Sequence, residues 1–442
     1  MSTREEVVTM KKTVSIFTLG CKVNQYETEA MKEAFQSSGY EVIPFEEPSD
    51  VYVINTCTVT HMSDRKSRQM IRRTKKINPE AIVAVVGCYA QAAKEEIEAI
   101  EEVDLILGTN GRAHIVEIVE EYRQNRVPMN FVDDIMAIHE FEELQINNMN
   151  ERTRAYLKIQ EGCNNYCSYC IIPYVRGNIR SRKPENIIAE VYRLAEEGFK
   201  EIVLTGIHVA SYGKDLKDMN LLEIIKQVHQ VEGIQRIRLS SIEPGVITEQ
   251  FVEEISKLSK VCQHFHLSLQ SGSDTVLNRM GRKYTAGEYK QAVKTLRKHL
   301  PEVAFTTDII VGFPGETRQE FDETVKFVEE IGFSHIHIFP FSPRKGTPAA
   351  TMEDQVSPQI KEDRVKILTT VAKASQNDVL KGYLGKTLTV LIEHNYNEDI
   401  YEGYTNNYIK VRIKSNEDCT NVFAKVKMIS VIDDVIYGEI EE

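Results

Sequence analysis

Three cysteines lie within one short stretch of the chain with the spacing C-x3-C-x2-C: Cys163, Cys167 and Cys170. Three sulfurs this close together cannot all pair as disulfides, and the spacing differs from the two-plus-two arrangement of zinc loops. Three thiolates can instead hold three corners of a cubane iron–sulfur cluster and leave the fourth iron without a protein ligand. An open iron can bind and activate a small molecule. The alternative is a zinc loop that takes its fourth ligand from a distant part of the chain.

Residues 1–125 alternate short apolar runs with helical patterns. This alternation predicts an open, parallel α/β sheet with helices on both faces. The expected strands are 13–19, 51–55, 81–86 and 103–107, and the expected helices are 27–38, 63–76, 92–100 and 112–121.

Three more cysteines stand just after predicted strands of this sheet: Cys21, Cys57 and Cys88. The carboxyl ends of parallel strands form the ligand crevice of open α/β sheets, so this topology would bring the three thiols together. Cysteine is also one of the most frequently buried residue types, and three unrelated core thiols are the alternative. We interpret the three as a second three-cysteine site, again with one iron open.

Residues 153–370 repeat a strand and a helical pattern six times, which predicts a partial (β/α)6 barrel rather than a complete eight-fold one. The expected strands are 154–160, 201–205, 236–240, 265–270, 304–311 and 334–339. The loop with Cys163 directly follows the first strand, at the carboxyl-end face that barrel enzymes use. The ends of the other strands are short, polar and glycine-rich, which lets a ligand approach closely, although each alone is also typical of an ordinary strand-to-helix turn. The expected cofactor-binding residues are Thr205, Gly206, Ser240, Glu243, Gln270 and Asp308.

Residues 371–442 contain short runs that are rich in β-branched residues and are separated by turn residues. This pattern predicts a small antiparallel β-barrel. Barrels of this size often bind single-stranded or looped RNA by stacking and charge. Four tyrosines offer stacking faces or belong to the core and rim: Tyr396, Tyr401, Tyr404 and Tyr408. The segment is net acidic, so its charge alone does not indicate RNA.

The formal net charge of the whole chain is −12, which argues against indiscriminate binding of nucleic acid. A local basic run nevertheless occupies residues 64–76, on the predicted helix after Cys57, and a second basic group follows Cys170. A basic run on a helix is usually a solvated face. Two such groups, each beginning near a proposed cluster, favour a surface that tracks phosphates. The expected RNA-binding residues are Arg65, Lys66, Arg68, Arg72, Arg176 and Arg180.

The start of the chain has no apolar stretch of signal-peptide type, and no apolar run approaches the length that spans a membrane. We therefore expect a cytoplasmic enzyme without a membrane partner. Eight cysteines in a chain of 442 residues are not a disulfide framework, and metal binding is the expected use.

The spacing of the first cysteine set and the aromatic Tyr169 before its last member resemble the radical S-adenosylmethionine (SAM) superfamily. The order of the predicted parts resembles the methylthiotransferase family over nearly the whole chain. These parts are a three-cysteine α/β domain (1–125), a linker (126–152), a radical SAM core (153–370) and an RNA-binding barrel of the TRAM type (371–442). The run LGCKVNQYE at 19–27 resembles the MtaB branch of that family.

The resemblance implies an enzyme with SAM and two 4Fe–4S clusters. Cys21, Cys57 and Cys88 would hold the auxiliary cluster, and the first set would hold the SAM-cleaving one, while Cys262 and Cys419 would be structural. No catalytic residue is expected beyond these ligands.

The implied substrate is N6-threonylcarbamoyladenosine at position 37, in the anticodon loop of tRNA, which would receive a methylthio group at C2. Two SAM molecules would be used, one to methylate a sulfur on the auxiliary cluster and one to generate the radical. A flavodoxin or ferredoxin would be the electron donor, and the source of the inserted sulfur is not implied. Two alternatives remain: a methylthiotransferase acting on an aspartate of a ribosomal protein, and a non-catalytic iron–sulfur protein that binds RNA.

Overall fold

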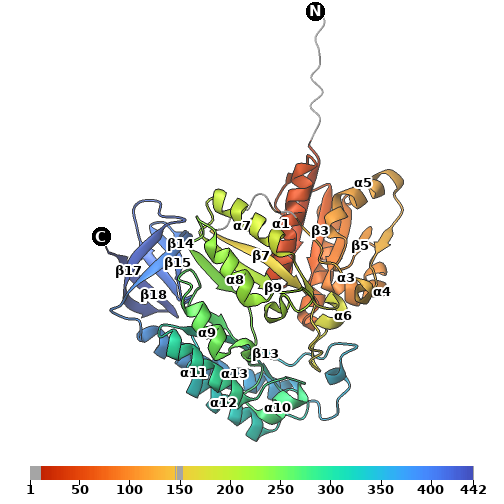
Figure 1. The fold of residues 1–442 in the computed structure, drawn as a ribbon. Helices are drawn as coiled ribbons and strands as arrows, with labels where there is room; N and C mark the ends of the chain where they lie inside the picture. The colour runs from red at the N-terminus through yellow and green to blue at the C-terminus, as the bar shows by residue number, and fades with distance from the viewer. Residues whose placement is uncertain (1–10, 145, 147–152, 442) are drawn as a thin grey trace, which may run out of the picture. The chain divides into compact units, whose positions relative to one another are not determined.

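The structure, a computed structural model, describes residues 11–144, 146 and 153–441 (Figure 1). The chain divides into two compact units. The first unit comprises Met1–Asn148 together with Ile171–Asn178, and the second comprises Met149–Cys170 and Ile179–Glu442. The short segment after Cys170 therefore belongs to the first unit, although it lies far along the chain from the rest of that unit.

The first unit is built on a parallel six-stranded sheet with the order β2-β1-β3-β4-β5-β6. Its strands are β1 Thr13–Thr18, β2 Glu41–Val42, β3 Val51–Thr56, β4 Ile82–Gly87, β5 Leu105–Leu107 and β6 Met129–Phe131. Its helices are α1 Lys22–Ser37, α2 His61–Ile77, α3 Cys88–Ala92, α4 Lys94–Glu98, α5 Ile115–Asn125 and α6 Ile172–Arg176. The predicted open parallel sheet is confirmed.

The central strands of this sheet are apolar along their whole length because both of their faces are covered. Side chains of a strand alternate between the two faces, so Val51 and Val53 enter one hydrophobic cluster with Phe35 of α1. Tyr52 and Ile54 enter a second cluster, on the opposite face, with residues of α2. The sheet is therefore packed between two layers. The carboxyl ends of its strands form the edge at which open α/β sheets bind ligands.

The structure corrects the sequence expectation in three places. The sheet contains the short strands β2 and β6, which were not expected, and β6 lies within the expected linker. The expected helix 92–100 is shorter, α4 at Lys94–Glu98, and a separate helix, α3, precedes it, because Ala93 between them leaves the helical region with φ −146° and ψ 52°. The remainder of the expected linker falls partly on residues 145 and 147–152, outside the described residues.

The second unit contains a curled sheet made of two parts, β10-β9-β7-β8 and β11-β12-β13. Isolated bridges from Ile237 to Val261 and from Ile242 to Leu267 continue the parallel pairing from β10 towards β11. Its strands are β7 Arg154–Glu161, β8 Arg180–Ser181, β9 Glu201–Gly206, β10 Arg236–Leu239, β11 His264–His266, β12 Ala304–Val311 and β13 His335–Pro340. All six expected strands are present, and the added strand β8 pairs antiparallel to β7. The partial barrel is confirmed.

The helices of the second unit follow its strands in alternation. They are α7 Pro184–Glu196, α8 Leu221–Gln230, α9 Glu249–Ser256, α10 Asp274–Arg279, α11 Ala286–His299, α12 Arg318–Ile331 and α13 Pro358–Lys381. Helix α13 runs without interruption across residue 370, at which the sequence places a domain boundary. None of the helices in the described part of the chain is long and apolar enough to cross a membrane.

The C-terminal strands close into a barrel with the order β14-β15-β16-β18-β17 (Figure 1, blue). Its strands are β14 Thr387–Asn397, β15 Ile400–Thr405, β16 Lys410–Lys414, β17 Phe423–Ile432 and β18 Val435–Ile440. The predicted small barrel is confirmed. The runs rich in β-branched residues cover 387–393, 408–414, 422–428 and 435–439, so β15 was not expected, and one pairing, between β16 and β18, is parallel.

Buried arginines of the curled sheet anchor this barrel within the second unit. The guanidinium of Arg238 donates to Glu201 Oε1 at 2.7 Å and to the backbone carbonyl of Asn406 in the barrel at 3.1 Å. Arg236 donates to the carbonyl of Thr389 at 2.7 Å. Glu201 and Arg238 are 0 % and 1 % exposed, so their charges compensate one another away from water.

We expect Arg238→Ala to lower the free energy of unfolding of the second unit by about 3 kcal/mol. The reason is that the buried, negatively charged Glu201 carboxylate would lose one of the positive charges that offset it. The measurement is urea unfolding followed by circular dichroism. The control is Lys257→Ala, which removes an ion pair to Glu254 from a lysine that is 68 % exposed. It should leave the free energy of unfolding unchanged within experimental error. Equal effects of the two substitutions would contradict the anchoring role.

Candidate metal centres

Cys21, Cys57 and Cys88 lie at the carboxyl ends of three adjacent strands in the first unit. Cys21 caps the N-terminus of α1, in the loop that follows β1; Cys57 follows β3; and Cys88 is the first residue of α3, directly after β4. Strands β1, β3 and β4 are neighbours in the sheet. The topology that the sequence predicted therefore places all three cysteines at one edge.

The three thiols interact with one another electrostatically at this edge. A Cβ on Gly20, which has φ +113°, would lie 3.2 Å from Cys57 Sγ, so the backbone before Cys21 passes directly beside Cys57. Burial raises the pKa of the Cys57 thiol. The pKa of Cys88 is raised to about 12, chiefly by burial; the charge of Arg176 opposes the rise, and negative charge on Cys57 and Cys21 adds to it. Three thiolates here need a cation to offset their charge, and a metal cluster would supply it.

Arg176, on α6 of the same unit, brings a positive charge to this edge. Its Nε donates to Cys88 Sγ at 3.2 Å. Its two terminal nitrogens donate to the Glu27 carboxylate at 2.5 and 3.1 Å, and one of them also donates to Asn24 Oδ1 at 3.0 Å. The side chain is 0 % exposed. Arg176 is therefore part of the interior beside Cys88, whereas Cys21 is exposed.

The C-x3-C-x2-C cysteines, Cys163, Cys167 and Cys170, occupy the loop that follows β7 in the second unit. Cys167 is buried, and burial raises the pKa of Cys163 to about 11. The loop is fixed by Ser168, whose N–H donates to the carbonyl of Met280 at 2.9 Å and whose own carbonyl accepts from Ala349 N–H at 2.8 Å. A hydrogen bond of 2.9 Å from Cys170 N–H to the Cys167 carbonyl tightens its end. The three thiols thus share a loop that is held in place by backbone contacts.

Arg282, which the sequence analysis did not single out, contacts this loop. It lies after α10, and its Nη1 donates to Cys167 Sγ at 3.3 Å. Its Nε donates to Tyr284 Oη at 3.0 Å. Arg282 follows neither a strand end nor a cysteine directly in the sequence, so only the folded chain reveals its position.

Glu243, a predicted cofactor-binding residue after β10, links Arg282 to the cysteine loop. Its carboxylate pairs with Arg282 Nη2 at 2.8 Å and with His208 Nε2 at 3.2 Å, and it accepts from Asn165 Nδ2 at 2.9 Å. Burial opposes the ionisation of Glu243, but hydrogen bonding to His208 and the charge of Arg282 lower its pKa to about 2. An ionised carboxylate therefore holds Asn165, inside the cysteine loop, in a fixed direction.

Gln270 and Asp308, two further predicted cofactor-binding residues, lie next to each other. The N–H of Gln270 donates to the carbonyl of Asp308 at 2.9 Å, and the Asp308 carboxylate lies 3.2 Å from His266 Nε2. Gln270 has φ +70°, a left-handed backbone that is rare for residues other than glycine. Strained backbone of this kind often marks a ligand site.

The remaining predicted cofactor-binding residues are Thr205, Gly206 and Ser240. Thr205 and Ser240 are buried at the ends of β9 and β10. Gly206 lies against the backbone of Gln160, where a Cβ would come within 2.9 Å of the carbonyl oxygen. Close packing explains the glycine without a ligand, and the assignment of these three to a cofactor stays a prediction.

The predicted RNA-binding residues divide into an exposed and a buried group. Arg65, Lys66 and Arg72 are exposed or partly exposed along α2. Arg68, on the same helix, is half-buried and donates to Tyr89 Oη at 2.7 Å. The basic run therefore presents at least three cations to solvent on one helix.

Arg176 and Arg180 need a correction. They are 0 % and 3 % exposed, so neither offers its guanidinium to a surface ligand. The sequence analysis assigned them to RNA because basic residues are usually solvated, but Arg176 is neutralised by Glu27, 149 residues earlier in the chain. Their assignment to RNA binding is therefore withdrawn.

The tyrosines of the C-terminal barrel also divide. Tyr404 and Tyr408 stack on each other with ring centroids 4.8 Å apart, and Arg154 lies over both rings. Tyr401 is buried in the barrel core. Tyr396 is 51 % exposed and carries Arg412 at 3.7 Å from its ring centroid. Tyr396 is thus the one of the four that presents a substantial face to solvent.

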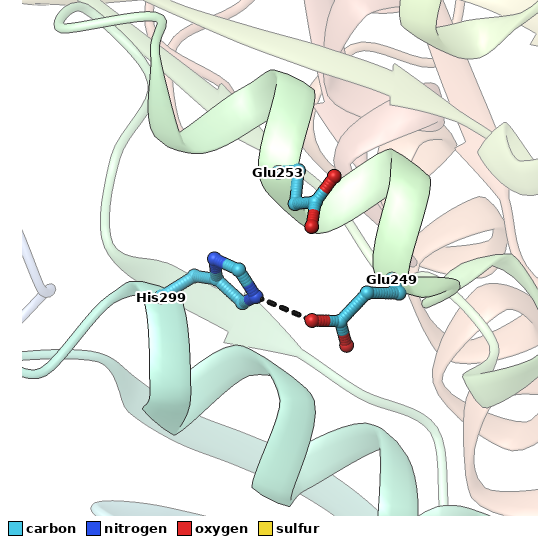
Figure 2. A group of neighbouring side chains, drawn as sticks. All are labelled: Glu249, Glu253 and His299. Carbon is cyan, nitrogen blue, oxygen red and sulfur yellow. Dashed lines mark hydrogen bonds and ion pairs between the residues drawn. The ribbon is translucent and has the colours of Figure 1, made fainter.

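Glu249, Glu253 and His299 form a small group at the surface of the second unit (Figure 2). His299 Nε2 lies 2.8 Å from Glu249 Oε1, and Lys298 pairs with the same oxygen. The Lys298 ammonium already forms an ion pair with the Glu249 carboxylate. These three residues therefore join α9 to the end of α11 through ordinary surface ion pairs.

All eight cysteines lie in the described part of the chain and are free thiols. One three-cysteine set offers its sulfur donors at the edge of a sheet, and the other offers them in a fixed loop. In each set, an arginine donates a hydrogen bond to one of the three sulfurs. Sulfur is the donor that iron–sulfur clusters require, and hydrogen bonds to the ligating sulfurs are part of their usual surroundings. The residues present therefore fit a cluster at each set.

Two family models match parts of this chain, and known proteins resemble it along most of its length. Residues 157–328 match the Radical SAM superfamily, and residues 13–108 match the Uncharacterized protein family UPF0004. Threonylcarbamoyladenosine tRNA methylthiotransferase MtaB of Bacillus subtilis (strain 168) is 47 % identical over 94 % of each chain. The tRNA-2-methylthio-N(6)-dimethylallyladenosine synthase of Moorella thermoacetica is 38 % identical over 88 % of each chain. The radical SAM methyltransferase TsrM of Kitasatospora setae has a similar fold, with a TM-score of 0.56 and 16 % identity over 77 % of each chain.

Proposed function

This chain belongs to the MtaB-type radical SAM methylthiotransferases, and on that premise we propose that it attaches a methylthio group to C2 of N6-threonylcarbamoyladenosine at position 37 of tRNA. The observation that carries the proposal is the pair of three-cysteine sets. One lies at a single sheet edge of the first unit, and the other lies in the loop after β7.

We assign Cys163, Cys167 and Cys170 to the SAM-cleaving 4Fe–4S cluster and Cys21, Cys57 and Cys88 to an auxiliary one. When bound, these clusters and SAM would supply the substrate radical and the methylated sulfur. The protein's part is to hold the ligands and to orient what binds beside them. Ionised Glu243 performs this for the cysteine loop through Asn165 and Arg282.

The predicted cofactor-binding residues keep that assignment as part of the proposal. Gln270 and Asp308 are supported by their adjacency and by the left-handed backbone at Gln270. Glu243 acts through its hydrogen bonds to the loop, and its low pKa keeps it ionised across the physiological range. We propose that these three side chains shape the SAM site.

We propose that the exposed cations of α2 contact the phosphates of the tRNA anticodon loop. Bases in such a loop are already unstacked in part, so exposing the target adenosine costs little. A flavodoxin or ferredoxin would supply the electrons. Because mature tRNA functions in the cytoplasm, we place the protein there.

Reversing the charge of Arg65, Lys66 and Arg72 together should weaken tRNA binding and flatten its salt dependence. The slope of log affinity against log salt should become shallower by roughly 2, since each phosphate that a cation neutralises on single-stranded RNA contributes about 0.7 to that slope. SAM cleavage without tRNA should not change. The measurement is filter binding at several salt concentrations.

The matched control for this experiment reverses three exposed lysines of the second unit, Lys257, Lys294 and Lys298. The net charge changes by the same amount, but the salt slope should stay within error of the unmodified protein. An equal loss of affinity in both triple variants would mean that only the overall charge matters, and α2 would lose its role.

A second candidate substrate is N6-dimethylallyladenosine, because an enzyme named for the 2-methylthio derivative of that nucleoside is 38 % identical to this chain. The higher identity to the B. subtilis protein favours the threonylcarbamoyl nucleoside. The ribosomal-protein alternative shares the architecture, but both relatives are named for tRNA adenosines.

An assay of the reconstituted protein under anaerobic, reducing conditions separates these substrates. Two tRNAs that differ only in carrying the threonylcarbamoyl or the dimethylallyl group would be offered with SAM, beside ribosomal protein as a third substrate. We expect the 2-methylthio product only from the first, as detected by nucleoside mass spectrometry. Product from the dimethylallyl tRNA alone, or methylthiolation of the ribosomal protein, would refute the assignment.

A further inference from the structure

Arg176 is a buried arginine that pairs with the Glu27 carboxylate and also contacts a cysteine sulfur. Its two terminal nitrogens bind both oxygens of Glu27. This forked pairing fixes the plane of the guanidinium. The Nε–H points to Cys88 Sγ at 3.2 Å. The ion pair thus locks the direction of the hydrogen bond to sulfur.

The surroundings of this contact exclude water. Arg176, Glu27 and Cys88 are 0 %, 0 % and 4 % exposed. Ile171 and Val175, from the same short segment as Arg176, pack against Cys88 in one hydrophobic cluster. A charged hydrogen bond in such an environment is stronger than in water, and it has a single orientation.

Arg112 provides an internal comparison. It is 1 % exposed, pairs with Glu27 as Arg176 does, and also donates to a carboxylate oxygen of Glu142 and to the Thr109 carbonyl. The two arginines therefore share a carboxylate, a burial class and a unit. They differ because Arg176 also donates a hydrogen bond from its Nε–H to the Cys88 sulfur.

We propose that Arg176 is a positioning residue of the auxiliary cluster: its Nε–H donates to the Cys88 sulfur, fixes the direction of that ligand and raises the reduction potential of the cluster. Hydrogen bonds to ligating sulfur stabilise the added negative charge of the reduced cluster, which is why they raise its potential. The inference rests on the proposed function in one respect, the role of Cys88 as a ligand.

The test compares Arg176→Lys with Arg112→Lys in a protein that carries Cys163→Ala, Cys167→Ala and Cys170→Ala, so that only the auxiliary cluster can form. Lysine keeps the positive charge in each case, but it has no guanidinium group and therefore lacks the Nε–H donor. Iron content and circular dichroism establish that each variant folds and is loaded. Redox titration followed by electron paramagnetic resonance then gives the reduction potential.

We expect Arg176→Lys to favour the oxidised cluster at least tenfold at a fixed potential, which corresponds to a fall of ~59 mV for one electron. Arg112→Lys should change that ratio less than twofold. Equal potentials in Arg176→Lys and the parent protein, or equal shifts in the two variants, would overturn the proposal.

A second measurement needs no substitution at Arg176. The parent protein with guanidino-¹⁵N-labelled arginine should show a weak ¹⁵N coupling in pulsed electron paramagnetic resonance of the reduced auxiliary cluster. A loaded cluster without that coupling would overturn the proposal even if Arg176→Lys does not fold. A parent protein that binds no iron would remove Cys88 as a ligand, and both the inference and the auxiliary part of the proposed function would fail.

Discussion

Cys57→Ala should abolish formation of the 2-methylthio nucleoside while cleavage of SAM to 5′-deoxyadenosine continues. Cys57 lies at the sheet edge of the first unit with Cys21 and Cys88, and its removal leaves two sulfurs where three are needed for an auxiliary cluster. The cysteine loop that follows β7 belongs to the second unit and keeps all of its ligands. The expected result is product below detection, with 5′-deoxyadenosine within about twofold of the unmodified enzyme.

The measurement is mass spectrometry of both small products from one anaerobic reaction. Cys419→Ala is the matched control, since Cys419 is half-buried in the C-terminal barrel and belongs to neither set. This control should retain both activities. A Cys57→Ala enzyme that still methylthiolates tRNA would show that the set formed by Cys21, Cys57 and Cys88 does not carry the sulfur.

Cys167→Ala should abolish both SAM cleavage and methylthiolation. Cys167 is the middle thiol of the C-x3-C-x2-C loop, it is buried, and it receives a hydrogen bond from Arg282 at 3.3 Å. Its loss removes a ligand and also leaves a buried guanidinium without its sulfur partner. We expect no 5′-deoxyadenosine, no product and about half of the iron of the unmodified protein.

The two cysteine variants are informative as a pair. Cys57→Ala separates the two activities, and Cys167→Ala removes both, because the radical precedes attachment of the methylthio group. If Cys167→Ala retained SAM cleavage, the loop after β7 would not be the SAM-cleaving site. The electron paramagnetic resonance spectrum of each reduced variant should show one cluster in place of two.

Much of the site could be predicted because it depends on topology. The runs 51–55 and 81–86 are apolar along most of their length, which is typical of strands buried on both faces, and parallel strands align their carboxyl ends at one edge. A cysteine directly after each of these strands was therefore predicted to lie at that edge. The structure places Cys57 and Cys88 there, and the role of the cysteines as ligands stays a proposal.

The arginines could not be predicted, because their environment is made by residues far away in the sequence. Arg176 follows the cysteine loop among other basic residues and was expected at the surface, but its carboxylate partner Glu27 lies on α1. Arg282 follows a helix and carries no motif, yet it reaches Cys167. Contacts of this kind depend on how distant elements pack.

Short and irregular elements were the other source of error. Strand β6 has three residues and strand β15 contains Glu402 and Gly403, so neither shows a clear apolar pattern. Both find their place by pairing with longer or more apolar neighbours, β5 and β14. Helix α13 continues through residue 370, and the domain boundaries stay predictions.

The central claim is that this protein methylthiolates threonylcarbamoyladenosine in tRNA. Nucleoside mass spectrometry of bulk tRNA, from cells lacking the gene and from the same cells complemented with it, tests the claim most directly. We predict loss of 2-methylthio-threonylcarbamoyladenosine, accumulation of its unthiolated precursor, and recovery of the product on complementation with the unmodified protein but not with Cys57→Ala. Unchanged tRNA nucleosides in the deletion strain would contradict the account.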